Sequence, residues 1–162
     1  MTDSDVRSLH ERVERKARRL HVLHQARTQC RSGCSSCCVD ELTVFEVEAD
    51  EIRTSYAELL ARGTPHAPGA CAFLDVANAC RIYEHRPYVC RTQGLPLRWI
   101  DERDDEAVEL RDICPLNENG PPVEMLAEEE CWTLGPFEEE LATMQSVSHP
   151  ELTRIPLRTL FK

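Results

Sequence analysis

Four cysteines lie within nine residues, in the segment CRSGCSSCC at positions 30–38. Thiolates are strong ligands for zinc and for iron–sulfur clusters, and a structural site generally uses four of them. The segment supplies Cys30, Cys34, Cys37 and Cys38, and Gly33 favours the turns that wrap a backbone around an ion. This spacing favours metal ligation over the alternative in which each thiol is a small buried hydrophobic side chain.

Five more cysteines follow the first segment, at positions 71, 80, 90, 114 and 131. The spacing of Cys71, Cys80 and Cys90 again favours ligands, and Cys114 is a further candidate, whereas Cys131 in AEEECWTL is expected to be an ordinary buried residue. The side chains of two adjacent cysteines tend to diverge, so both are poorly placed for one mononuclear ion. The 37–38 pair therefore predicts more than one metal ion, in two four-thiolate sites or one multinuclear site.

The thiols are expected to be reduced rather than paired in disulfides. Nine is an odd number, and the segment MTDSDVRSLHERVERKARRL is charged from its start and lacks the apolar core of a signal peptide. No stretch approaches the ~18 apolar residues of a membrane-spanning helix. We therefore expect a cytoplasmic protein that does not associate with membranes, in which clustered cysteines bind metal or perform chemistry.

The formal net charge is −10, and it is unevenly distributed. Residues 1–30 carry seven Lys and Arg against four Asp and Glu, or +3, which leaves −13 for the remainder. An acidic body repels phosphate backbones, so nucleic acid is not expected as a partner. We interpret the basic N-terminal stretch as a solvated helix face rather than a docking segment.

The predicted fold is mainly α with a small β-hairpin, in a single domain whose cysteine-rich centre is irregular and knit by metal. An amphipathic helix is predicted over 5–28, with apolar residues three or four apart, and the segments 122–132 and 136–147 are also predicted to be helical. The alternating segments LPLRWID and EAVELRDI predict the hairpin. We divide the chain into an N-terminal helix (1–29), a metal-binding core (30–114) and a C-terminal helical part of the same domain (115–162).

Local signals mark the ends of other predicted helices. Thr43 and Glu46 have the spacing of a capping box, and Gly63 is a C-terminal stop for the helix between them. Pro87 predicts the first turn of a short helix. His21 and His24, near the end of the first helix, are expected to be partly exposed side chains rather than metal ligands.

Three segments together resemble the YkgJ-like cysteine-cluster family, a zinc- or iron-chelating domain also called CxxCxxCC. They are CRSGCSSCC, CAFL and CRIYEHRPYVCR, and the resemblance covers about half of the chain, from 30 to 114. Carried over by position, it implies a ligand set of eight thiols: Cys30, Cys34, Cys37, Cys38, Cys71, Cys80, Cys90 and Cys114. Arg86, Pro87 and Arg91 fall on the family's RP and CR positions.

The guanidinium groups of Arg86 and Arg91 could offset the negative charge of a thiolate site. A positive group beside metal ligands tunes the affinity for the metal. The alternative is that each arginine forms an ion pair with acidic groups of the body, and the sequence favours neither.

The sequence favours a metal-binding protein whose site is structural, or serves metal handling or partner contacts. The first alternative is an enzyme, an oxidoreductase or a transferase that uses zinc or an iron–sulfur cluster. Against it, we find no glycine-rich phosphate loop, nucleophile elbow or HExxH motif. A weaker alternative is a thiol redox sensor. Thiolate ligation suits zinc and iron–sulfur clusters equally, so the metal stays open.

Overall fold

The computed structural model describes residues 3–103 and 105–162. The N-terminal helix α1 spans Asp3–Leu23 and ends five residues before the predicted boundary at 28. After α1 the chain turns, and the backbone N–H groups of Arg27 and Thr28 donate to the carbonyl of His24. The side chain of Leu23 is 54% exposed, so the predicted apolar stripe ends at Leu20.

The remaining elements are short. The other α-helices are α2 (Glu46–Ser55), α3 (Ala57–Arg62), α4 (Tyr88–Arg91) and α5 (Pro136–Ser148). The strands are β1 (Thr43–Phe45), β2 (Leu97–Arg103), β3 (Glu106–Asp112), β4 (Trp132–Thr133) and β5 (Arg154–Pro156). Single 3₁₀ turns span Tyr83–His85, Pro115–Asn117, Val123–Met125, Glu128–Glu130 and Leu157–Leu160.

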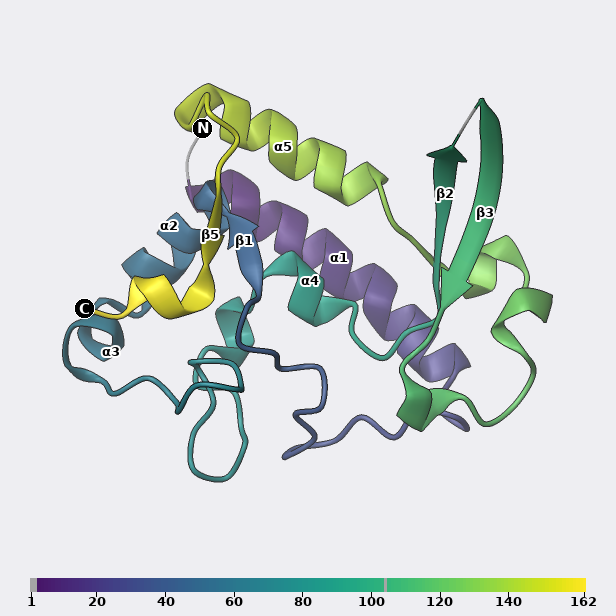
Figure 1. The fold of residues 1–162 in the computed structure, drawn as a ribbon, viewed down its shortest axis with the longest axis horizontal. Coiled ribbons are helices and arrows are strands. Elements are labelled where there is room, and N and C mark those ends of the chain that lie inside the picture. Colours follow the sequence, from purple (N-terminus) through teal and green to yellow (C-terminus); the bar gives the residue numbers. More distant parts are fainter. Residues whose placement is uncertain (1–2, 104) are drawn as a thin grey trace.

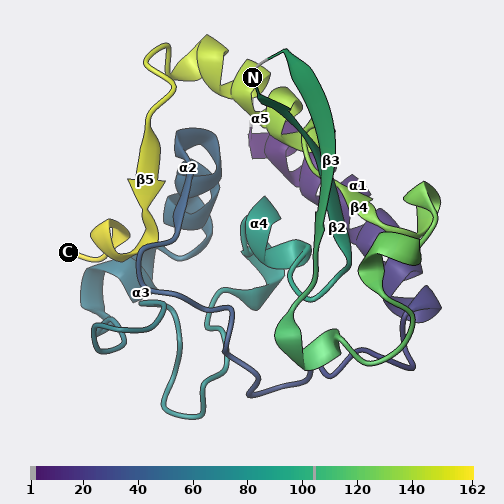
Figure 2. The same ribbon diagram turned by 45° about the vertical axis from the view of Figure 1, so that its right-hand side comes forward.

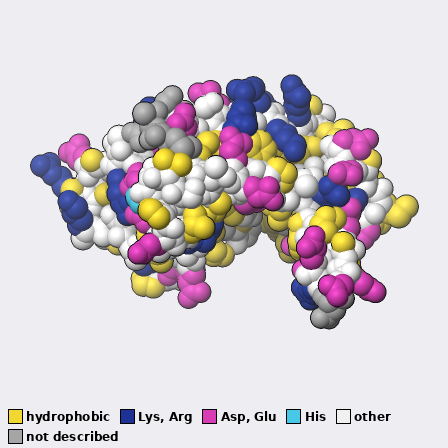
Figure 3. Space-filling model, turned by 90° about the horizontal axis from the view of Figure 1, so that it is seen from above, with side chains coloured by type: hydrophobic (Ala, Val, Ile, Leu, Met, Phe, Trp, Pro, Cys, Tyr) yellow, Lys and Arg dark blue, Asp and Glu magenta, His cyan; other side chains and the backbone are white. Residues whose placement is uncertain are grey.

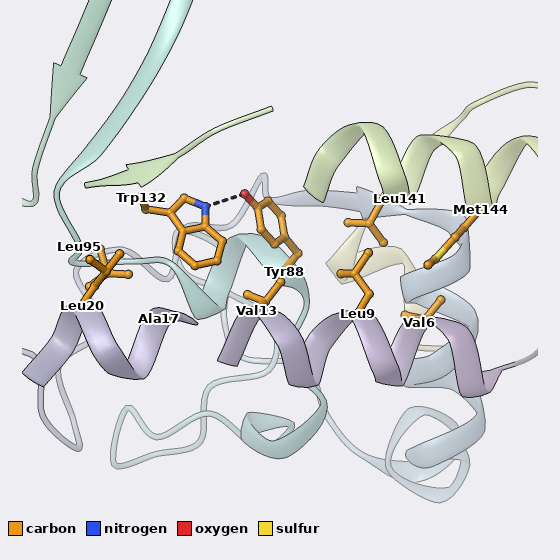
Figure 4. Close-up of a cluster of buried hydrophobic side chains, with 10 residues drawn as sticks. All are labelled: Val6, Leu9, Val13, Ala17, Leu20, Tyr88, Leu95, Trp132, Leu141 and Met144. Atoms are coloured by element: carbon orange, nitrogen blue, oxygen red, sulfur yellow. Dashed lines mark hydrogen bonds between the residues drawn. The ribbon is translucent and has the colours of Figure 1, made fainter. Parts of the chain in front are cut away.

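One apolar core forms along α1, which contacts α2, α4 and α5 (Figure 1). Its side chains come from all three predicted segments of the chain (Figure 4): Val6, Leu9, Val13, Ala17, Leu20, Tyr88, Leu95, Trp132, Leu141 and Met144. The indole N–H of Trp132 donates to the hydroxyl of Tyr88 at 2.9 Å, which satisfies a polar group inside this core. This core fixes α4, which carries one of the cysteines, against α1.

A second core joins α2 and α3 to the C-terminal segment and the cysteine-rich loops. Its buried residues are Val44, Ala49, Ile52, Leu60, Cys71, Phe73, Leu74, Ile82, Leu157 and Leu160, and Cys38 and Cys80 pack against them. The ring centroids of Phe73 and Phe161 lie 4.9 Å apart. Three of the predicted ligand cysteines therefore lie at the edge of an apolar core.

Two small sheets flank α4, which lies between them in both ribbon views (Figures 1 and 2). β2 and β3 form the predicted antiparallel hairpin, with Leu97 opposite Asp112. Its edge is extended by β4, parallel to β2. The second sheet pairs β1 antiparallel with β5, and the sequence did not predict it.

The capping box at Thr43 and Glu46 is wrong. Thr43 lies in β1, where it pairs with Pro156, and α2 begins at Glu46 without a side-chain cap from Thr43. The amide oxygen of Gln145 on α5 accepts from the backbone N–H of Glu46 at 2.6 Å instead. A partner remote in sequence thus replaces the local cap. The predicted stop at Gly63 is confirmed, since Gly63 caps α3 and a Cβ there would lie 2.4 Å from the carbonyl oxygen of Leu59.

The predicted helix over 122–132 is also wrong. The chain makes two 3₁₀ turns there, and Cys131 precedes strand β4 rather than lying in a helix. The carboxylate of Glu130 accepts from the backbone N–H of Ala127, and Trp132 is drawn into pairing with β2. Local capping and sheet pairing override the helical propensity of the glutamates.

Helical residues make up 43% of the chain and strands 15%, which confirms the mainly helical class. The irregular segments 24–42 and 63–82 lie on the same side of the molecule in both ribbon views (Figures 1 and 2). Seen from above, acidic and basic side chains are interspersed (Figure 3). Within the described ranges, no helix combines the length and the apolar character needed to cross a membrane.

Candidate metal centre

The cysteines of the second core are brought together by backbone contacts between the two irregular segments. The backbone N–H of Cys71 donates to the carbonyl of Cys38 at 2.9 Å. An isolated antiparallel bridge joins Leu74 to Cys80. Cys90 lies in α4, which follows the extended Pro87.

A tight turn closes the chain between Cys71 and Cys80. The carboxylate of Asp75 accepts from the backbone N–H groups of Ala77 and Ala79, at 2.8 and 2.9 Å. These hydrogen bonds stabilise the ionised form and lower the pKa of Asp75. An aspartate that binds backbone groups close ahead in the chain is typical of a turn, so the return of the chain at this point is encoded locally.

The adjacent thiols of Cys37 and Cys38 interact directly. A hydrogen bond between them lowers the pKa of Cys37 to about 6. The same hydrogen bond raises the pKa of Cys38, and burial and the nearby Cys71 and Cys90 add to this rise. The hydrogen bond therefore stabilises the thiolate of Cys37 and disfavours that of Cys38. A nearby cation would favour the thiolate form of both residues.

Three more thiols belong to the same electrostatic neighbourhood. Burial is the main cause that raises the pKa of Cys71, of Cys80 and of Cys90. The pKa of Cys90 is raised further by Cys71, Cys80 and Glu48 and by Cys37. We call these residues the five-thiol group: Cys37, Cys38, Cys71, Cys80 and Cys90.

The other three predicted ligands have different surroundings. Cys30 is exposed, and its sulfur accepts a hydrogen bond from the side-chain amide of Asn117 at 3.5 Å. Cys34 is half-buried, with its sulfur 4.0 Å from the hydroxyl of Ser36. Cys114 precedes the 3₁₀ turn Pro115–Asn117.

The five-thiol group is not a finished ligand shell. In the part of the chain that the structure describes, no three Cys, His, Asp or Glu side chains are arranged so that they could hold a metal ion. The donor chemistry nevertheless fits such an ion, because thiols are soft sulfur donors, and burial opposes the ionisation of Cys71, Cys80 and Cys90 where no cation is present. The metal-knit centre remains a prediction.

Arg86 and Arg91 both form ion pairs, and Arg86 also acts on one of the thiols. Each guanidinium donates to the same carboxylate oxygen of Glu14 on α1, at 3.1 Å. The remaining donors of Arg91 bind the carbonyls of Arg86 and Glu84. The positive charge of Arg86 also lowers the pKa of Cys80, a minor effect beside burial. The ion pairs therefore attach the segment between Cys80 and Cys90 to α1.

The remaining cysteine and the histidines lie elsewhere. Cys131 is buried with Ile113, Val123 and Leu126, and Arg111 donates to its sulfur at 3.7 Å. His24 is 7% exposed and its ring contacts the carbonyl of Glu130 at 2.7 Å, so the prediction that it is partly exposed is wrong. The long-range contact with Glu130 explains its burial.

Two residues beside the thiols were missed by the sequence interpretation. Glu48 on α2 is buried, and one of its oxygens accepts from the backbone N–H of Tyr88 at 2.6 Å and contacts the ring of His10 at 2.9 Å. The second is Asn117, which is completely buried. A carboxylate four residues before Ile52, on the apolar face of a helix, is a signal that could have identified Glu48.

Fold and site together define a small, mainly helical protein with a cluster of free cysteines beside its core. Residues 29–115 match the family model CxxCxxCC, described as "Putative zinc- or iron-chelating domain". The match covers more than half of the chain and confirms the resemblance, so the chain belongs to this family. No curated protein and no solved structure matches the chain.

Proposed function

We propose that the protein binds zinc or iron through its cysteines, with the five-thiol group as the centre of the site. The observation that carries this proposal is the match of residues 29–115 to a zinc- or iron-chelating family, supported by the contacts that bring Cys38, Cys71 and Cys80 to one core. Cys30, Cys34 and Cys114 complete the proposed ligand set. A bound metal would supply either structural cross-links between the irregular segments or, as an iron–sulfur cluster, a redox centre.

The proposal includes more than one metal ion. Five thiols exceed the four ligands of a usual mononuclear site, and three further cysteines lie outside the group. All nine cysteines are free. Free cysteines in this number favour a reducing compartment such as the cytosol.

Metal analysis of protein purified without oxygen tests the proposal. We expect zinc or iron in excess of one equivalent per chain, and an absorption band near ~400 nm with labile sulfide if the metal is an iron–sulfur cluster. A colourless protein with zinc alone would exclude the cluster. A protein that contains neither metal, and takes up neither when supplied with both, would refute the proposal.

Single substitutions test the role of the adjacent pair. If Cys37 and Cys38 serve different ions, Cys37→Ser and Cys38→Ser each lower the bound metal by part of the total, and the combined variant lowers it further. Unchanged metal in both single variants would show that the pair does not ligate.

A further inference from the structure

The sulfur of Cys30 is held by a buried asparagine outside the family match. The side-chain amide of Asn117 donates to the sulfur at 3.5 Å and to the carbonyl of Gly94 at 2.8 Å. Its amide oxygen accepts from the backbone N–H of Gln29 at 2.7 Å. The partners fix the orientation of the amide, because acceptors lie on its nitrogen side and a donor lies on its oxygen side.

Gly94 leaves space for the same sulfur because it has no side chain. A Cβ at this position would lie 2.4 Å from the sulfur of Cys30 and 3.1 Å from the amide nitrogen of Asn117. Gly94 also has a φ of +85°, which favours glycine. The backbone of Gly94 and the amide of Asn117 therefore both contact the sulfur, although Cys30 as a residue is exposed.

The backbone of Asn117 links the surroundings of the Cys30 sulfur to the segment of Cys114. Its N–H donates to the carbonyl of Cys114 at 2.8 Å, and its carbonyl accepts from the guanidinium of Arg27 at 2.8 Å. Arg27 is itself buried. One residue thus joins the start of the first cysteine segment to Cys114, more than 80 residues later in the chain.

We propose that Asn117 is a positioning residue for metal binding: its amide orients the sulfur of Cys30, one of the proposed ligands. This inference rests on the proposed function. A hydrogen bond donated to a ligand sulfur tunes a metal site, and loss of such an outer contact typically weakens metal affinity 10–100-fold. The exposed side of Cys30 leaves the sulfur accessible to an incoming ion.

The test is a double-mutant cycle on the full chain, with Zn²⁺ and, without oxygen, Fe²⁺ as the titrated ions. Asn117→Asp keeps an oxygen that can accept from Gln29 but replaces the donor that faces Cys30. We expect it to weaken the affinity 10–100-fold. In the Cys30→Ala background the same change is expected to have no further effect, because Asn117 acts through that sulfur.

Asn119→Asp is the matched control, because it introduces the same charge at an exposed residue two positions away and is expected to leave the affinity unchanged. If Asn117→Asp does not fold, as judged by circular dichroism, Asn117→Ser replaces it with the same expectations. Unchanged affinity, or equal losses with and without Cys30, would overturn the inference and leave the proposed function intact. A wild-type chain that binds neither ion would refute both.

Discussion

Single thiols in this protein differ mainly in what surrounds them. Cys90 is placed so that burial and neighbouring thiols raise its pKa, Cys30 rests on a glycine, and Cys131 belongs to a separate apolar cluster. The sequence identified every one of these cysteines and separated Cys131 from the others. It could not identify Asn117, because the contact with Cys30 joins residues distant in the chain and leaves no local pattern.

Replacement of Gly94 tests whether the sulfur of Cys30 requires a residue without a side chain at position 94. The backbone at position 94 is left-handed, which strains any residue with a Cβ, and the Cβ of Gly94→Ala would also overlap the sulfur of Cys30. We therefore expect the free energy of unfolding of the metal-free protein to fall by about 2–4 kcal/mol. Gly69→Ala is the matched control, since Gly69 also has a positive φ but nothing within 4 Å of its Cβ position. The control should lose only about 1 kcal/mol. Equal losses in urea denaturation would show that the sulfur does not constrain Gly94.

At the scale of elements, the sequence predicted what depends on local periodicity. The β2–β3 hairpin and α5 were predicted with nearly the right boundaries, whereas α1 was predicted to end five residues too late. The β1–β5 sheet and the cap of α2 by Gln145 were missed, because each depends on a partner about 100 residues away. Pairing of this kind competes with local propensity and is not visible in a short window.

Glu48 connects three helices and offers a test at this scale. Its carboxylate lies on α2, contacts His10 on α1 and accepts from the first backbone N–H of α4. Glu48→Ala leaves that N–H without its acceptor inside the core, and we expect a loss of about 2–4 kcal/mol in the free energy of unfolding. Glu48→Gln keeps an acceptor and should lose roughly 1 kcal/mol.

The matched control for Glu48 is Glu58→Ala, at a side chain that is 83% exposed and pairs with Arg62 at the surface. We expect a change below about 0.5 kcal/mol for this variant. Thermal or urea unfolding of the three metal-free variants measures these differences. A loss in Glu48→Ala no larger than in Glu58→Ala would contradict the role given to Glu48.

The lowered pKa of Glu109 on β3 predicts how acid affects the stability that the β2–β3 hairpin contributes. A hydrogen bond from Arg98, and a second from Arg111, lower the pKa of this carboxyl. A depressed pKa in the folded state means that the stabilisation is present above the ordinary pKa of glutamate. It is lost as the pH falls from there through the folded-state pKa. Between neutral pH and pH ~3, the metal-free wild type should therefore lose more stability than Glu109→Gln. Parallel pH profiles of the two proteins would contradict this assignment.

At the scale of the whole molecule, the helices form a scaffold, and the cysteine segments beside it have little regular secondary structure. Residues 24–42 and 63–82 contain little regular backbone pairing, so their positions depend on turns, side-chain hydrogen bonds and the second core. Ligand binding in such segments contributes directly to folding. The sequence predicted the mainly helical class, and the metal-knit centre stays a prediction. The family resemblance predicted that these thiols share a site, but the backbone hydrogen bond between Cys71 and Cys38 joins residues distant in the chain and leaves no local pattern.

The most direct test compares the metal content of two cysteine variants with that of the wild type. Cys90→Ala removes a member of the five-thiol group, and Cys131→Ala removes a buried thiol of the separate cluster. Elemental analysis of the three proteins, purified without oxygen, should show metal in the wild type and in Cys131→Ala and a clear loss in Cys90→Ala. Full metal content in Cys90→Ala, or equal losses in both variants, would contradict the assignment of the metal to the five-thiol group.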